Sequence, residues 1–133
     1  MRPNVFMFFA TVLLLLLIAT PLLAHHSFMV AFDLSKSIAV KGVVTKVAWV
    51  NPHISFHMDV TDETGRVTTW GVDAAAPAAL AARGWIRTSL RPGDVVTVEG
   101  FPARDGKPFA AAAIVTLSDG RKILAGSDGA TPR

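Results

Sequence analysis

The sequence contains no cysteine, and its charged residues are few and nearly balanced in sign. Without cysteine the chain cannot form disulfides, thiolate metal sites or a lipidated N-terminal cysteine, so its stability must come from an apolar core. Asp and Glu number 10 against 13 Lys and Arg, a formal net charge of +3. That excess is too small to predict a polyanionic partner from charge alone.

The first 24 residues differ in composition from all that follows. Arg2 supplies a short basic start, Val5 to Ala19 is an almost unbroken apolar run, and Ala24 is the small residue that a signal peptidase requires. We therefore predict a signal peptide over residues 1–24, a signal helix that is cleaved near Ala24. The alternative is a retained membrane anchor, since about 20 apolar residues suffice to cross a bilayer. In both cases the remainder lies outside the cytoplasm.

Cleavage would leave residues 25–133, which have the size of a single domain. From Ser37 onward apolar residues recur at period two, and turn signals are spaced as expected for short strands in a barrel or sandwich. We divide this part into an N-terminal arm over 25–36, a barrel domain over 37–124 and a flexible tail over 125–133.

The strands can be placed from the alternation. We expect them over 37–50, 53–60, 67–73, 95–101 and 109–117, with a short last strand at 122–124. The first is long, and we expect a bulge at Gly42 to bend it. That bulge would turn apolar residues of both parities inward, namely Ile38, Val40, Val43, Val47 and Trp49. In the second strand the inner face would hold Ile54, Phe56, Met58 and Val60, and the outer face His53, Ser55, His57 and Asp59.

Between the third and fourth strands the period changes. Pro77 to Arg83 is rich in Ala, opens with Pro and closes on Gly84, which predicts a short helix. We expect Trp85 to pack against the barrel. Three strands, a helix and two or three further strands match the OB-fold. The prediction is an all-β, OB-like Greek-key barrel of five to six strands with one short helix. The alternative is a Greek-key sandwich, in which the helix would have no defined packing position.

Two short motifs are distinctive: His25-His26-Ser27-Phe28 and the Trp49-x-Asn51-Pro52-His53 corner. With them the chain resembles an uncharacterised family of small exported bacterial proteins, classed as a domain of unknown function. The resemblance implies a periplasmic or secreted protein with an OB-like barrel and no known activity. Ala48 and Asp73 stand where the family pattern leads us to expect Glu, so an acidic role at the first of these positions is absent here.

Cleavage after Ala24 would make His25 the mature N-terminus. A free amine has a pKa of about 7.7–8 and an imidazole one of about 6.5, so both can act as neutral ligands near neutral pH. The amine and imidazole of His25, or the amine, backbone amide nitrogen and imidazole of His26, would lie near one plane, which suits Cu(II) or Ni(II) better than tetrahedral zinc. We take copper as the sharper prediction.

A third imidazole could come from His53 or His57, but not from both. Four residues along a strand span about 13 Å, whereas a metal–nitrogen bond is about 2 Å. We favour His53, which gives a candidate metal site of His25, His26 and His53. The rival site, for an unknown ligand, uses Asn51, Ser55 and His57 on the outer face. The plainer interpretation is that these histidines only hydrogen-bond backbone groups or lie on a solvated surface.

No catalytic motif stands out. The sequence lacks a Gly-x-Ser-x-Gly elbow, a phosphate-binding loop and a His-Glu-x-x-His helix, so we predict that the protein is not an enzyme. The apolar parities assign Trp49, Phe56 and Trp70 to the core, and we therefore predict no nucleic-acid partner. The function predicted is an exported, non-catalytic binding or accessory domain for an unknown small ligand or periplasmic protein. The alternative is a periplasmic copper or other divalent-metal site, and a membrane is a partner only if the signal segment is retained.

Overall fold

The computed structural model of the chain describes residues 9 and 30–126. By its contacts the chain divides into two units, Met1–Ala31 and Phe32–Arg133. The predicted signal helix lies almost wholly outside the described residues. Within them, no helix combines the length and the hydropathy that crossing a bilayer requires.

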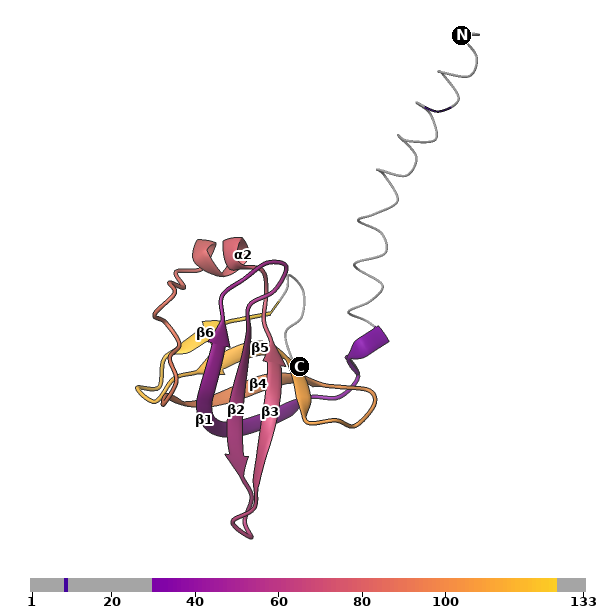
Figure 1. Ribbon diagram of the computed structural model, residues 1–133, viewed down its shortest axis with the longest axis vertical. Coiled ribbons are helices and arrows are strands. Elements are labelled where there is room, and N and C mark those ends of the chain that lie inside the picture. Colours follow the sequence, from indigo (N-terminus) through magenta and orange to yellow (C-terminus); the bar gives the residue numbers. More distant parts are fainter. Residues whose placement is uncertain (1–8, 10–29, 127–133) are drawn as a thin grey trace. The chain divides into compact units, whose positions relative to one another are not determined.

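Six strands of the described residues form one sheet in the order β3-β2-β1-β4-β5-β6 (Figure 1). The bounds of the strands are β1 Ile38–Ala48, β2 Ser55–Thr61, β3 Val67–Asp73, β4 Val95–Pro102, β5 Phe109–Thr116 and β6 Lys122–Leu124. Neighbours in this order pair antiparallel. An additional parallel pairing between β3 and β5 closes the first five strands into a barrel. Together with helix α2, Pro77–Ala82, between β3 and β4, this is the predicted OB-like all-β fold, and β6 is an extra strand.

The inner wall is the apolar face that the alternation predicts. Phe56 and Met58 of β2 are buried, whereas His57 between them is exposed. Trp49 and Trp70 are half-buried and pack against the same core. Fully burying one large apolar side chain contributes roughly 1.5–3 kcal/mol. Burial of this core therefore supplies the stability that a chain without disulfides requires.

The bulge in β1 is not at Gly42, so that prediction is wrong. Pairing of β1 with β4 is regular through Gly42, and the shift in β1–β2 pairing falls between Val44 and Lys46. Val44 is consequently buried and Val43 is 43% exposed, the reverse of the expected arrangement for Val43. Gly42 serves another purpose: a Cβ there would lie 2.6 Å from the carbonyl oxygen of Asp59. Glycine in a strand can mark a close approach as well as a bulge.

Helix α2 begins with Pro77 at its first turn and ends before Gly84, which has φ +89°. Leu80 is its fully buried residue and belongs to the barrel core. Trp85 follows, 2% exposed, and its indole Nε1 donates a hydrogen bond to the carbonyl oxygen of Leu124 at 3.2 Å. The helix thus packs at a defined position against the barrel, as the OB-like arrangement requires.

Closure between β3 and β5 depends on an aromatic side chain over a glycine. A Cβ at Gly71 would lie 2.5 Å from Cδ2 of the Phe109 ring, so the ring occupies the space that a larger residue would fill. Phe109 in turn stacks on Phe32, with ring centroids 5.6 Å apart. Phe32 also bridges to Ala103. The ring pair therefore covers the seam at which the barrel closes.

Two boundaries of the predicted domains can be followed in the described residues. Phe32 and Asp33, assigned to the arm, pair with the chain at and after the end of β4, where the Asp33 amide donates to the carbonyl of Pro102 at 2.9 Å. Ala125 and Gly126, assigned to the tail, are buried, and the Ala125 amide donates to the carbonyl of Ala113.

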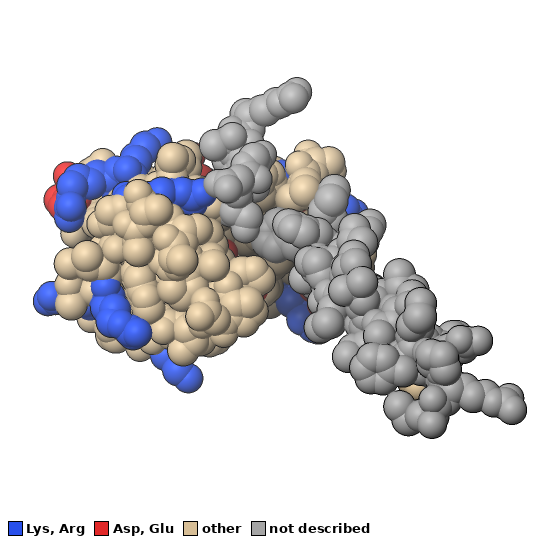
Figure 2. Space-filling view, turned by 90° about the horizontal axis from the view of Figure 1, so that it is seen from above, with Lys and Arg blue, Asp and Glu red and all other residues tan. Residues whose placement is uncertain are grey.

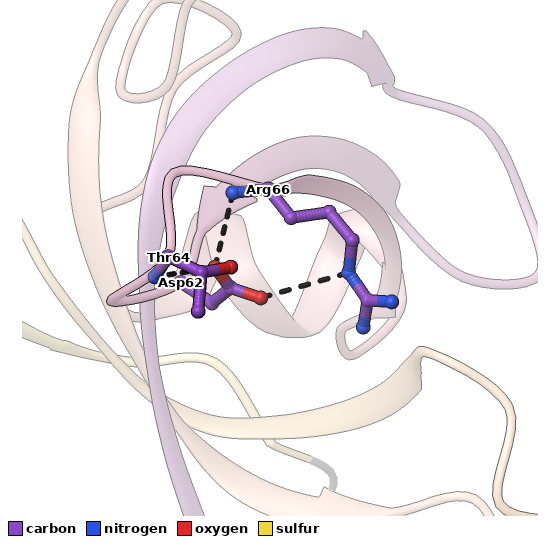
Figure 3. A network of polar contacts seen from close by, with 3 residues as sticks. All are labelled: Asp62, Thr64 and Arg66. Atoms are coloured by element: carbon purple, nitrogen blue, oxygen red, sulfur yellow. Dashed lines mark hydrogen bonds and ion pairs between the residues drawn. The ribbon is translucent and has the colours of Figure 1, made fainter.

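The β2–β3 hairpin is held by one aspartate. Oδ1 of Asp62 accepts hydrogen bonds from the backbone amide and hydroxyl of Thr64 and from the backbone amide of Arg66, and the Arg66 guanidinium lies 3.6 Å from the other carboxylate oxygen (Figure 3). The Thr64 hydroxyl bond is the largest cause that lowers the pKa of Asp62. These contacts satisfy hydrogen-bond donors of the loop from within the loop, as Asx turns do. They identify Asp62 as a structural residue.

Candidate functional site

The outer face of the barrel carries a carboxylate with an unusual environment at the end where α2 lies. Asp73, the last residue of β3, pairs with Ser55, the first residue of β2. Ile54, Phe56 and Val72 point inward and are buried, so Ser55 and Asp73 point outward. His53 precedes β2 by two residues. We call His53, Ser55 and Asp73 the Asp73 site.

Backbone hydrogen bonds fix the position of this site. The Ile54 amide donates to the carbonyl of Ala75, and the Ala74 amide donates to the carbonyl of Ile54. The corner before β2 is thereby tied to the chain that follows β3. Figure 1 shows this corner, the end of β3 and α2 at the same end of the barrel.

Asp73 differs from the other half-buried acidic residues of the described barrel in having no partner for its carboxylate. Within residues 30–126 it is the one half-buried acid with neither a hydrogen bond nor an ion pair to its carboxylate among the described residues. Its nearest equivalent, Asp59 on the same face of β2, accepts a 2.6 Å hydrogen bond from the Thr69 hydroxyl. A half-buried carboxylate without a partner costs folding free energy, because lost hydration is not replaced.

Burial raises the pKa of Asp73 above 3.8, and the nearby His53 only partly offsets the effect. Part of the burial comes from the neighbouring strand, because Asp73 pairs in parallel with Ala111 of β5. Alanine has no polar side-chain atom to donate to the carboxylate. A group whose pKa is raised by desolvation beside a second titratable side chain is a candidate functional group.

The surface around this end of the barrel is poor in charge. Figure 2, viewed from the α2 end, shows a broad area free of charged side chains with Lys and Arg side chains around it and few acidic ones. An isolated carboxylate in such surroundings attracts a cation or a hydrogen-bond donor more strongly than one within a salt-bridge network does.

The predicted ligand-binding residues fall near the Asp73 site. Asn51 and His53 are exposed in the corner between β1 and β2, and Ser55 is half-buried beside Asp73. His57 is exposed on the same face, one cross-strand row further along, between Lys46 and Gly71. Ser55 is thus brought together with Asp73, while His57 belongs to the next row.

The predicted metal ligands cannot be assembled in the described residues. His25 and His26 lie outside them. Within residues 30–126 no group of three His, Cys, Asp or Glu side chains is arranged to hold a metal ion. His53 and Asp73 supply one imidazole and one carboxylate at the same end of the barrel.

Sequence reasoning missed Asp73 as a site residue. The period-two alternation that directs Val72 inward also directs Asp73 outward. This outward parity was the signal in the sequence that could have identified Asp73. The absence of a partner depends on which strands flank β3 and could not be read from the sequence.

We predict that Asp73→Asn stabilises the protein at neutral pH, because the amide removes a desolvated charge at constant shape. Since the folded-state pKa of Asp73 is raised, the folded form binds more protons than the unfolded form above pH 3.8. The stability that Asp73 contributes to the wild type is therefore fully present below pH 3.8 and is lost as the pH rises through the raised pKa. Thermal midpoints of both proteins across this range check it.

The difference between the two melting curves is the informative quantity. Four acids with lowered pKa values act in the opposite direction in both proteins and cancel in the difference, namely Asp33, Asp62, Asp105 and Asp119. A variant less stable than the wild type at pH 7 would show that Asp73 has a stabilising partner.

The barrel and its solitary carboxylate define the chain as an OB-like domain with a candidate binding site on its outer face. The chain belongs to a family of unknown function, DUF6152, whose model matches residues 13–112. Membership of a family of unknown function was the prediction from the sequence, while the export of its members stays a prediction. No curated protein matches the sequence.

Two solved structures are similar to the barrel in fold. One is the mitochondrial single-stranded DNA-binding protein Rim1 of S. cerevisiae, at 10% identity and a TM-score of 0.49 over 62% of this chain and 93% of that one. The other is from yeast Stn1 and Ten1, at 12% identity and a TM-score of 0.41 over 61% of this chain and 42% of that one.

The exclusion of nucleic acid as a partner is corrected by this comparison. Rim1 is a single-stranded DNA-binding protein, whereas the prediction from the sequence was that no nucleic acid is a partner. That prediction considered only Trp49, Phe56 and Trp70. It overlooked Phe109, whose half-buried ring lies over Gly71 on the outer face.

Proposed function

We propose that this protein is an exported, non-catalytic binding domain whose ligand occupies the Asp73 site. The observation that carries the proposal is the half-buried Asp73 carboxylate without a partner. A fold that tolerates this cost gains from it only when a further molecule supplies the missing donors. In OB-folds the face of strands 2 and 3 is the usual ligand surface, and Asp73 and Ser55 lie on it.

A non-catalytic role is supported by how the three side chains relate. Nucleophilic catalysis needs a hydroxyl within hydrogen-bond reach of a base. In the described residues no hydrogen bond joins Ser55 to His53, or His53 to Asp73. The three groups offer a ligand separate acceptors rather than a relay.

Export is supported by the composition of residues 1–24 and by the small residue Ala24 at their end. Intact-mass measurement of the protein recovered from the periplasm or medium of an expressing bacterium tests it. We expect a mass that begins at His25. A mass that retains Arg2 would favour an anchor, and recovery only from the cytoplasm would refute export.

A second candidate function is copper binding by His25, His26 and His53. The observation that favours it is the exposed His53 imidazole beside Asp73, which places two further donor types near one another. Titration of the processed protein with Cu(II), followed by d–d absorption, tests this. We expect an absorption band that His26→Ala abolishes. An unchanged spectrum, or a band indifferent to that change, would reject copper.

The binding function itself can be tested with chemically distinct probes. Thermal midpoints of wild type and Asp73→Asn are compared with cadaverine, N-acetylglucosamine and an oligodeoxythymidine, and bound probes are mapped by amide chemical shifts. We expect at least one probe to perturb the amides of Ser55 and Asp73. Perturbations confined to other faces, or none with any probe, would reject the Asp73 site as the ligand site.

A further inference from the structure

We infer that the Asp73 site recognises a primary ammonium group, either of a small free amine or of a lysine side chain. This inference rests on the proposed function and names the ligand class for its site. It follows from the unpartnered Asp73 carboxylate, its cross-strand neighbour Ser55 and the imidazole of His53.

The Asp73 carboxylate lacks a hydrogen-bond donor among the described residues. An ionised carboxylate is an acceptor only, and hydrogen bonds to it from charged donors are about twice as strong as neutral ones. No basic residue of the described ranges forms an ion pair with Asp73. Lys46, on the neighbouring row, pairs across to His57 instead of Ser55. The donors left to this carboxylate are therefore water and, in this proposal, the ammonium group of a ligand.

The Asp73 site offers as many hydrogen-bond acceptors as a primary ammonium group has donors. An ammonium group has three N–H donors directed to three sides. The Asp73 carboxylate, the Ser55 hydroxyl oxygen and, in its neutral form, an imidazole nitrogen of His53 can each accept one hydrogen bond. Neither Ser55 nor His53 has a hydrogen bond among the described residues that would occupy it.

Other classes of ligand match the Asp73 site less well than a primary ammonium group does. An anion would meet the negative charge of Asp73, with which no Lys or Arg of residues 30–126 forms an ion pair. A metal ion would find one imidazole and one carboxylate in the described barrel, which is no closed site. A quaternary ammonium would lack the N–H donors. A primary ammonium matches both the charge and the acceptors.

The test is an amide and imidazole chemical-shift titration of the full exported protein. The probes are cadaverine as a free amine, N-acetyl-lysine methylamide as a lysine side chain, and N-acetylglucosamine as a neutral comparison. Asp73→Asn is compared with a matched control, Asp59→Asn, which removes an outer-face acid that already has a partner in Thr69.

We expect saturable shifts at Ser55, Asp73 and His53 with one or both amines, at dissociation constants on the order of millimolar. Asp73→Asn should weaken binding at least about tenfold, because a charge-assisted hydrogen bond contributes about 1.5–3 kcal/mol, while Asp59→Asn should leave it unchanged. Binding of cadaverine alone would identify a free amine as the ligand, and binding of the lysine derivative alone a peptide side chain.

Three results would overturn the inference. Amine shifts that are equal in wild type and Asp73→Asn would show that the carboxylate is not the acceptor. If only the neutral sugar perturbs Ser55 and His53, the site binds a ligand of another class and the proposed function survives. If no probe perturbs the site, both the inference and the proposed function fail.

Discussion

Replacing Gly100 with alanine is expected to destabilise the barrel by about 3 kcal/mol, because the added methyl group has no room. A Cβ at this position would lie 2.0 Å from the carbonyl oxygen of Ala111 and 3.0 Å from its carbon. Both are backbone atoms of β5, so no side chain can move aside. β4 would have to separate from β5 at the point where their register shifts.

Urea unfolding followed by tryptophan fluorescence measures this effect. Gly65→Ala is the matched control: it adds the same methyl group where nothing lies within 4 Å, at φ +84°. A left-handed conformation costs a non-glycine residue about 1–2 kcal/mol. We expect the loss at Gly100 to exceed that at Gly65. Equal losses would mean that β4 and β5 are not as close as described.

Trp85→Ala is expected to cost about 3–5 kcal/mol, the usual range for truncating a buried large aromatic side chain. Trp85 lies in the main core and is 2% exposed. Its indole also ties the chain after α2 to β6 through the hydrogen bond to Leu124. The Ala75 amide donates a hydrogen bond to the carbonyl of Ala125, the residue that follows Leu124. The indole contact therefore also helps to hold the chain that follows Asp73.

The substitution should therefore affect the binding site as well as stability. Amide shifts of Ser55 and Asp73 are expected to change in Trp85→Ala at a temperature where the variant remains folded. Trp85→Phe, which keeps most of the ring volume but loses the indole N–H, should cost about 0.5–1.5 kcal/mol. A loss below 1 kcal/mol for Trp85→Ala would contradict the buried position of the indole.

The architecture could be predicted because period-two alternation and turn residues are local signals. Phe56 and Met58 were assigned to the core for that reason, and Pro77 and Gly84 marked a helix that the structure contains. Gly42 was misinterpreted because a glycine in a strand has two physical causes. Only the position of the Asp59 carbonyl, set by a partner strand, distinguishes them.

The candidate site was predicted in part. Ser55 and His53 followed from the outward parity of β2, but Asp73 emerged as its central residue only once β2 and β5 were seen to flank it. Cross-strand neighbours depend on register and on barrel closure, which are non-local. The lack of a hydrogen-bond partner is likewise a property of the fold and has no sequence signature.

The central claim is that Asp73 is a desolvated carboxylate held ready for a cationic ligand. The carboxyl carbon of Asp73 can be followed by ¹³C NMR as a function of pH, without and with saturating cadaverine. We expect a pKa above 3.8 for the protein alone and a lower pKa once the amine is added. A pKa at or below 3.8 in the free protein, or one that the amine leaves unchanged, would contradict the account.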